Sequence, residues 1–147
     1  MFFLLAKNIQ PGIINSNMHD HHHDHGTLMQ NVAAEYADIF ENSDQGIYVF
    51  LDDENKVCNK KFATMLGYES PEAWAKVEES FPMAFVATES HKTLIGAYQD
   101  AMDKVEGSVN SITWKKKDGS TMNSNVILVP IVYENHLLAL HFVTSSS

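Results

Sequence analysis

The chain has 147 residues and a formal net charge of −9, from 19 acidic and 10 basic side chains. A chain of this length buries about 70% of its unfolded surface, enough for one hydrophobic core without disulfides or metals. The acidic balance argues against nucleic-acid binding, since phosphate backbones are bound by basic surfaces. The single cysteine excludes an internal disulfide, and no segment has the roughly 18 consecutive apolar residues of a membrane-spanning helix. We therefore predict one cytoplasmic domain that binds neither nucleic acid nor membrane.

Residues 1–26 are predicted to form a flexible tail rich in turn-forming residues, including Pro11 and Gly12. Its apolar start lacks the preceding basic residues of a secretory signal. Histidines interleaved with carboxylates follow, and neutral imidazoles at this density bind zinc, nickel or copper. Because no scaffold fixes their geometry, a solvated tail is the first interpretation and a metal site the alternative. The histidines are His19, His21, His22, His23 and His25.

The domain proper is predicted to occupy residues 27–147. Thr27 precedes Gln30 by three residues, the spacing of a capping box. An apolar stripe then runs through residues 28–41, which predicts an amphipathic helix.

The next segment predicts a strand, a turn, a short return strand and a helix. Residues 47–51 are apolar on both alternating sides, and residues 52–55 are turn formers. After the short strand 56–58, Asn59 is placed to cap a helix that Gly67 ends. The apolar positions of this helix are Phe62, Met65 and Leu66.

Two helices are expected in the middle of the chain. Ser70 and Pro71 begin a short helix that ends near Val77, and residues 81–86 are predicted to be a loop or a single turn over the core.

A longer helix, capped by Thr88 or Ser90, carries a regular apolar stripe and is predicted to stop at Gly107. The stripe consists of Leu94, Ala97, Tyr98, Ala101, Met102 and Val105.

Three strands complete the prediction, at residues 108–116, 120–133 and 136–144. Asp118–Gly119 is a strong hairpin signal between the first two strands, and Glu134–Asn135 a weaker one between the second pair. The last two strands are apolar on both sides, so the sheet needs two covers. The central helices can cover one face, leaving the other for the N-terminal helix, a partner subunit or both.

Two sequence motifs, one after the other along the chain, together resemble those of the PAS domain family, the sensory α+β modules of signalling proteins. The first follows a short strand, and the second is a basic Asp-Gly-Ser hairpin in residues 114–120. The resemblance covers residues 27 to 144 and implies an α+β fold, with helices on one face of a five-stranded antiparallel sheet and the N-terminal helix on the other. It also implies a homodimer through helix 28–41 and the outer sheet face. The first motif consists of Asn59, Phe62, Leu66, Gly67 and Tyr68.

The resemblance further implies a pocket between the inner sheet face and the helices, which in the family holds haem, flavin, another chromophore, a carboxylic acid or nothing. The flavin-reactive cysteine motif is absent, and Cys58 is expected to be a small buried group. His91 lies off the apolar stripe, so haem is not expected either, and His141 is expected to be a hydrogen-bonded histidine on the sheet. The cofactor is left open. The pocket candidates, for which ordinary core packing is the alternative, are Phe62, Met65, Leu66, Tyr98, Met102 and Trp114.

No sequence motif indicates an enzyme, because the chain lacks a phosphate-binding glycine loop, a nucleophile elbow and a metal-binding His-Glu-x-x-His helix. We predict a non-catalytic sensory domain that senses a small molecule or binds proteins, acts as a homodimer and signals to an unidentified effector protein. The alternative is a metal-binding protein that uses the histidines of residues 19–25.

Overall fold

The computed structural model describes residues 25–146. The predictions for residues 1–24, including those for His19, His21, His22 and His23, lie outside the described residues. None of the helices in residues 25–146 is both long and apolar enough to cross a membrane.

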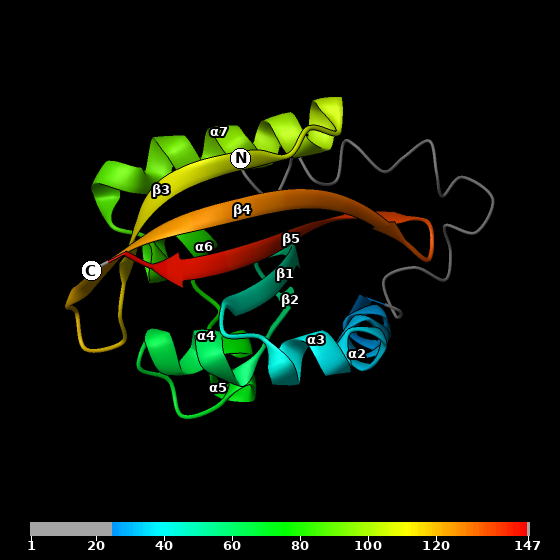
Figure 1. Cartoon of the computed structure of the whole chain (residues 1–147), viewed down its shortest axis with the longest axis horizontal. Coiled ribbons are helices and arrows are strands. Elements are labelled where there is room, and N and C mark those ends of the chain that lie inside the picture. The colour runs from blue at the N-terminus through cyan, green and yellow to red at the C-terminus, as the bar shows by residue number, and fades with distance from the viewer. Residues whose placement is uncertain (1–24, 147) are drawn as a thin grey trace.

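The described residues form a five-stranded antiparallel sheet with strand order β2-β1-β5-β4-β3 (Figure 1). The first and last parts of the chain therefore pair at the centre of the sheet, where Tyr48 lies opposite His141. This confirms the predicted α+β class and the five strands. The strands are β1 (Gly46–Asp52), β2 (Asn55–Cys58), β3 (Ser108–Lys115), β4 (Thr121–Tyr133) and β5 (His136–Ser145).

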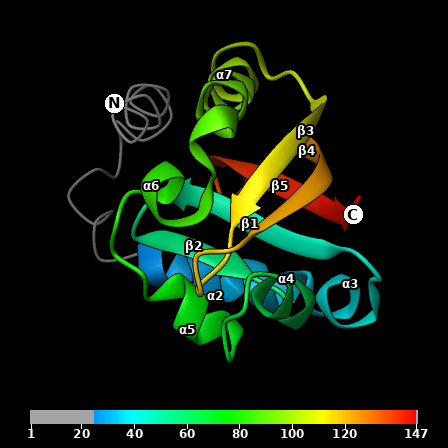
Figure 2. The same ribbon diagram turned by 90° about the vertical axis from the view of Figure 1, so that its left-hand side faces the viewer.

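Helices cover both faces of the sheet, as predicted (Figures 1 and 2). One group packs on what we call the inner face, and Figure 1 shows α7 on the opposite side of the strands from α2 and α3. The inner helices are α4 (Lys60–Met65), α5 (Pro71–Ala75), α6 (Phe81–Phe85) and α7 (Thr88–Lys104). The outer face is covered by α2 (His25–Glu35) and α3 (Ala37–Asn42).

The inner face holds a core dominated by aromatic rings. Phe62 is fully buried, and its ring centroid lies 4.8 Å from that of Tyr48 and 5.2 Å from that of Trp114. Trp74 and Phe81 close the same cluster, with ring centroids 6.1 Å apart. Edge-to-face and offset contacts at such distances are the favoured aromatic geometries.

The outer face holds a smaller, mostly aliphatic core. Leu28 and Val32 of α2 are buried against Val49 of β1 and Leu138 of β5. The Tyr133 hydroxyl also donates to the backbone oxygen of Asn31 at 3.3 Å. The amphipathic stripe of the N-terminal helix therefore faces the sheet of its own chain.

Asn59 joins the two layers. Its Oδ1 accepts from the backbone N–H of Phe62 at 2.9 Å, which is the predicted helix cap, and also from that of Ile47 at 3.0 Å. Its Nδ2 donates to the backbone oxygens of Phe40 and Gln45, each at 3.1 Å. One buried side chain thus connects α3, β1 and α4 with four hydrogen bonds.

The predicted helix 28–41 is two helices, and Thr27 does not cap its start. The first helix already begins at His25, and the chain departs from helical geometry at Tyr36, where φ is −103° and ψ is 18°. Tyr36 and Phe40 are both partly buried against the outer core. Because a β-sheet is twisted, a bend lets two short helices follow its surface more closely than one straight helix.

The ends of α7 also differ from the prediction. Its N-cap residue is Ala87, and no side chain caps the helix there. Thr88 is already the first helical residue, and the Ser90 hydroxyl accepts the backbone N–H of Thr113 in β3 instead. The left-handed residue that ends α7 is Val105, with φ of 55°. Gly107 serves a different purpose, since a Cβ there would lie 3.0 Å from the backbone oxygen of Leu128.

Candidate functional site

A small cavity lies between the inner face of the sheet and the helices α6 and α7. Its volume is about 10 Å³, roughly the room that one water molecule needs. It is lined by Tyr48, Phe50, Phe81, Leu94, Tyr98 and His141.

Tyr48 and His141 form a stacked pair at this cavity. They are direct partners on β1 and β5, so the alternation of both strands places their side chains on the inner face. Their ring centroids are 3.9 Å apart with an interplanar angle of 10°, and each residue is at most 2% exposed. Tyr48 Oη and His141 Nδ1 are buried and have no hydrogen-bond partner among residues 25–146.

Burial keeps both groups uncharged. It lowers the pKa of His141 to about 3, although nearby backbone groups of Tyr48 and Ala139 act in the opposite direction. Burial likewise raises the pKa of Tyr48 well above its ordinary value. At neutral pH the pair therefore presents a phenol and a neutral imidazole, which suit an uncharged hydrogen-bonding molecule.

Tyr98 closes the cavity from α7. Its hydroxyl donates to the backbone oxygen of Leu51 at 3.4 Å, and its ring stands edge-on to Phe50 with centroids 5.4 Å apart. Burial raises its pKa, and the carboxylates of Asp52 and Asp53 act in the same direction. Tyr98 is thus tied to β1, the strand that also supplies Tyr48 and Phe50 to the cavity.

The six predicted pocket residues all belong to the inner core. Five are buried there, and Met65 is partly buried against it. Only Tyr98 among them lines the cavity. The Trp114 Nε1 donates to the Ser124 hydroxyl at 2.7 Å, so its polar group is bonded within the protein. The other members of the set are Phe62, Leu66 and Met102.

The sequence prediction missed the five other residues that line the cavity. The alternation of residues 47–51 already placed Tyr48 and Phe50 on one side of a strand, so these two were accessible from the sequence. His141 was expected to be hydrogen-bonded, and backbone groups of Tyr48 and Ala139 do bond to it, whereas its Nδ1 has no partner among the described residues. Its role depends on which strand it pairs with, and no local pattern reveals that.

The residues considered for haem and flavin lie elsewhere. His91 Nε2 is 2.7 Å from the backbone oxygen of Val86, and His91 does not line the cavity. Cys58 is buried in β2, and burial raises the pKa of its thiol, which disfavours the reactive thiolate. Within residues 25–146, no group of three or more His, Cys, Asp or Glu side chains is arranged to hold a metal ion.

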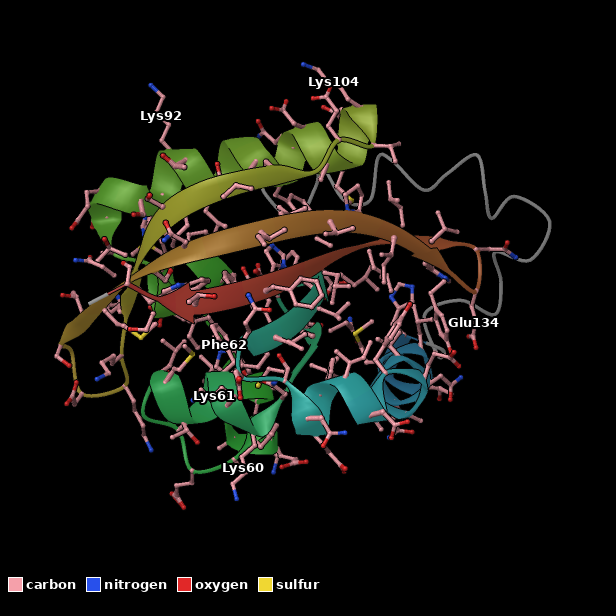
Figure 3. The ribbon with its side chains drawn as sticks, viewed as in Figure 1. Lys60, Lys61, Phe62, Lys92, Lys104 and Glu134 are labelled. Atoms are coloured by element: carbon pink, nitrogen blue, oxygen red, sulfur yellow. The ribbon has the colours of Figure 1, made fainter. Side chains whose placement is uncertain are left out.

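A larger groove opens on the surface between α2–α3 and α4–α5, with a volume of about 600 Å³. Ala33 and Ala37 form part of one wall, and Lys60 on α4, labelled in Figure 3, lies on the other. Glu41 and Glu72 also line it, so its charges do not select an anion or a cation. We assign no function to this groove.

Comparison with known proteins agrees with this architecture. Residues 34–97 match the sequence model of the PAS domain family. The fold resembles the PAS domain of a protein from Colwellia psychrerythraea, with a TM-score of 0.60 and 21% identity, over 78% of this chain and 96% of that one. No curated protein sequence matches the chain significantly.

Two further solved structures show the same fold. The PAS domain of an HTR-like protein from Haloarcula marismortui has a TM-score of 0.58 and 20% identity, over 80% of this chain and 93% of that one. A sensory box histidine kinase/response regulator from Burkholderia thailandensis has a TM-score of 0.56 and 6% identity, over 76% and 84%. Taken together, the match of residues 34–97 to the family model, the strand order and the two-sided helical cover show that this chain has the fold of PAS domains.

Proposed function

We propose that this chain is a non-catalytic sensory domain that binds a small uncharged polar molecule in its core and passes the signal on as a homodimer. The observation that carries the ligand proposal is the stacked pair of Tyr48 and His141, which line the cavity and carry two buried polar atoms without a hydrogen-bond partner among the described residues. A buried polar atom without a hydrogen bond costs about 1–3 kcal/mol. A molecule that bonds to both atoms recovers much of this cost, and its binding is therefore linked to the stability of the core.

The ligand must be small or must displace side chains. The cavity has room for about one water molecule, so a ligand with several non-hydrogen atoms requires Phe81, Leu94 or Tyr98 to move. These three residues come from α6 and α7. Ligand entry thus shifts the helical cover relative to the sheet, and we propose this shift as the first step of signalling.

Native mass spectrometry of the freshly purified full chain tests the ligand proposal, together with its absorption spectrum. We expect the wild type to retain an additional mass. The control variant Lys61→Ala changes an exposed residue of α4 and should retain the same mass. Tyr48→Phe, which removes only the hydroxyl, should lose it. A preparation without additional mass, or one in which Tyr48→Phe retains it unchanged, would contradict the proposal.

The dimer proposal rests on the part of the outer face that α2 and α3 leave open. The strand register places Val109, Ile127 and Phe142 side by side in one row across β3, β4 and β5. Val109 is 71% exposed and Ile127 is 42% exposed. A second copy that covers this row, together with α2, would remove apolar side chains from water.

Light scattering after size-exclusion chromatography at high micromolar concentration tests this dimer. We expect a dimer for the wild type and a monomer for Ile127→Asp, since a buried carboxylate opposes association. Val132→Asp is the matched control, because Val132 is an exposed apolar residue of the same strand on its other side. A monomeric wild type, or equal effects of the two changes, would contradict the dimer surface.

We also propose that the domain signals to a separate effector protein. One of the solved structures with this fold is described as a sensory box histidine kinase/response regulator, which supports a role in signal transduction. We infer that this chain passes its signal to another protein through the dimer surface.

A further inference from the structure

Lys56 of β2 is a buried lysine, with only 3% of its surface exposed. Its Nζ donates to the backbone oxygens of Asp53 at 2.6 Å, Ala75 at 3.2 Å and Val77 at 3.0 Å, so all three of its N–H groups are bonded. The ammonium also lies 5.5 Å from the ring centroid of Trp74, within the range of a cation–π contact. One side chain therefore joins the turn after β1, the end of α5 and the aromatic core.

Stability alone does not explain this lysine. Removing an ammonium from water is costly, and an apolar side chain of similar volume in place of a buried charge often leaves a protein equally stable or more stable. The lysine adds direction instead, because its bonds hold two backbone oxygens that lie 19 and 21 residues further along the chain. Apolar packing against β2 would not fix these two positions in the same way.

The segment that Lys56 holds leads from α5 to α6 (Figure 2), and we call its residues 76–80 the connector. Residues 78–80 of the connector are exposed. Its far end is also attached to the turn between β1 and β2, because Asp53 Oδ1 accepts the backbone N–H of Phe81 at 2.9 Å. Two residues only three positions apart, Asp53 and Lys56, thus hold both ends of the connector.

The connector and its flanking residues border two separate spaces. Ala75 and Val77, whose backbone oxygens Lys56 binds, line a surface hollow of about 740 Å³. Phe81, at the other end of the connector, lines the small cavity together with Tyr48, and the centroids of their rings are 5.4 Å apart. The same short segment therefore forms part of the wall of an open hollow and of the closed cavity.

We propose that Lys56 and Asp53 form a latch on the connector, and that release of this latch opens the route by which a small uncharged molecule reaches the cavity. This inference rests on the proposed function of the cavity. Release breaks two bonds of Lys56 and the bond of Asp53 to Phe81, which frees Phe81 to leave the cavity wall. The latch thus selects Phe81 as the side chain that an entering ligand displaces.

Hydrogen exchange of the full chain, measured by mass spectrometry, tests the latch and needs no known ligand. Lys56→Met removes the ammonium but keeps an unbranched side chain of similar length. We expect exchange of residues 76–86 to accelerate by about tenfold or more, while that of residues 137–143 in β5 changes by less than about twofold. Lys76→Met is the matched control, because Lys76 is an exposed residue of the connector, and its exchange should equal that of the wild type.

Acrylamide, itself a small uncharged polar molecule, tests whether release opens the core. It quenches the fluorescence of tryptophans that it reaches, and Trp74 and Trp114 are both fully buried in the inner core. We expect weak quenching for the wild type and for Lys76→Met. The quenching constant of Lys56→Met should be at least about threefold higher, because local opening admits the probe.

A second pair of variants keeps the test decisive if Lys56→Met does not fold. Asp53→Ala removes the acceptor of the Phe81 N–H and should accelerate exchange in the same segment, whereas Asp53→Asn retains an acceptor oxygen and should resemble the wild type. The latch is overturned if residues 76–86 accelerate no more than β5, if Asp53→Asn behaves like Asp53→Ala, or if acrylamide quenching stays at the wild-type level in the folded variants.

The latch and the ligand proposal fail separately. A purified chain without additional mass contradicts the ligand proposal, whatever the exchange rates are. Uniform exchange in Lys56→Met contradicts the latch, even where the chain retains a bound molecule.

Discussion

The two faces of the sheet are lined by different types of side chain and are covered by helices to different extents. The inner face is sealed by aromatic rings from four helices, and its cavity holds about one water molecule. The outer face is covered by two short helices over aliphatic side chains, and one row of it remains open at Val109 and Ile127. We therefore expect the inner face to dominate the stability of the domain and to enclose the proposed ligand site, whereas the outer face carries the proposed dimer surface.

The largest effect should come from the centre of the inner face. Phe62→Ala removes a fully buried ring that contacts Tyr48, Trp74 and Trp114. We expect the free energy of unfolding to fall by about 3–5 kcal/mol. Urea denaturation would measure it, with Lys61→Ala on the same helix as an exposed control that changes little. A loss below about 1 kcal/mol would show that the ring is not a core element.

The connection between the two faces should come next. Asn59→Ala leaves the backbone groups of Ile47, Phe40 and Gln45 without this partner and removes the cap of α4. We expect a loss of about 3 kcal/mol, because each buried group that loses its bond costs about 1–3 kcal/mol. Asn42→Ala breaks an exposed side-chain bond to Asp38 and should cost far less. Similar losses for the two variants in urea denaturation would refute the bridging role of Asn59.

His141 should make the inner face sensitive to acid. An unfolded histidine titrates near pH 6.5, whereas burial lowers the folded pKa to about 3. Between these values the unfolded state binds a proton that the folded state excludes, so stability falls as the pH falls from about 6.5 towards 3. His141→Leu lacks this group. The free energy of unfolding of the wild type, relative to the variant, should therefore drop by about 2–3 kcal/mol between pH 7 and pH 4.5.

Denaturation curves of both proteins at several pH values measure this difference, in which the contributions of the carboxylates largely cancel. Parallel stability profiles for the wild type and His141→Leu would mean that His141 is not buried in its neutral form.

The smallest of these effects should come from the outer face. Leu28→Ala removes a buried side chain of α2, but the short helix can shift to fill part of the space. We expect a loss of about 2 kcal/mol, at the low end for a leucine. Hydrogen exchange should accelerate in α2 more than in the inner helices. Gln30→Ala, an exposed change on the same helix, serves as the control, and a loss as large as that of Phe62→Ala would remove the contrast between the faces.

Local sequence signals predicted much of this fold. The strands and the cap by Asn59 follow from alternation, turn residues and capping chemistry within a few positions, and these predictions are confirmed. The sequence did not predict the bend at Tyr36. It also did not predict that the Ser90 hydroxyl accepts the backbone N–H of Thr113 and does not cap the helix. Both depend on how an element packs against a strand distant in sequence, which a local pattern does not contain.

The candidate site shows the same division. Tyr98 was predicted from the apolar stripe of its helix, and it lines the cavity. The partnership of Tyr48 with His141 depends on the pairing of β1 with β5, which the sequence alone did not specify. The proposed site on the inner face therefore depends on the strand topology, whereas its aromatic surroundings follow from the composition of the chain.

A high-resolution crystal structure of the protein as purified tests the central claim most directly. We predict electron density for a molecule of several non-hydrogen atoms within hydrogen-bond distance of both Tyr48 Oη and His141 Nδ1. A cavity that is empty, or that holds a single water molecule, would contradict it.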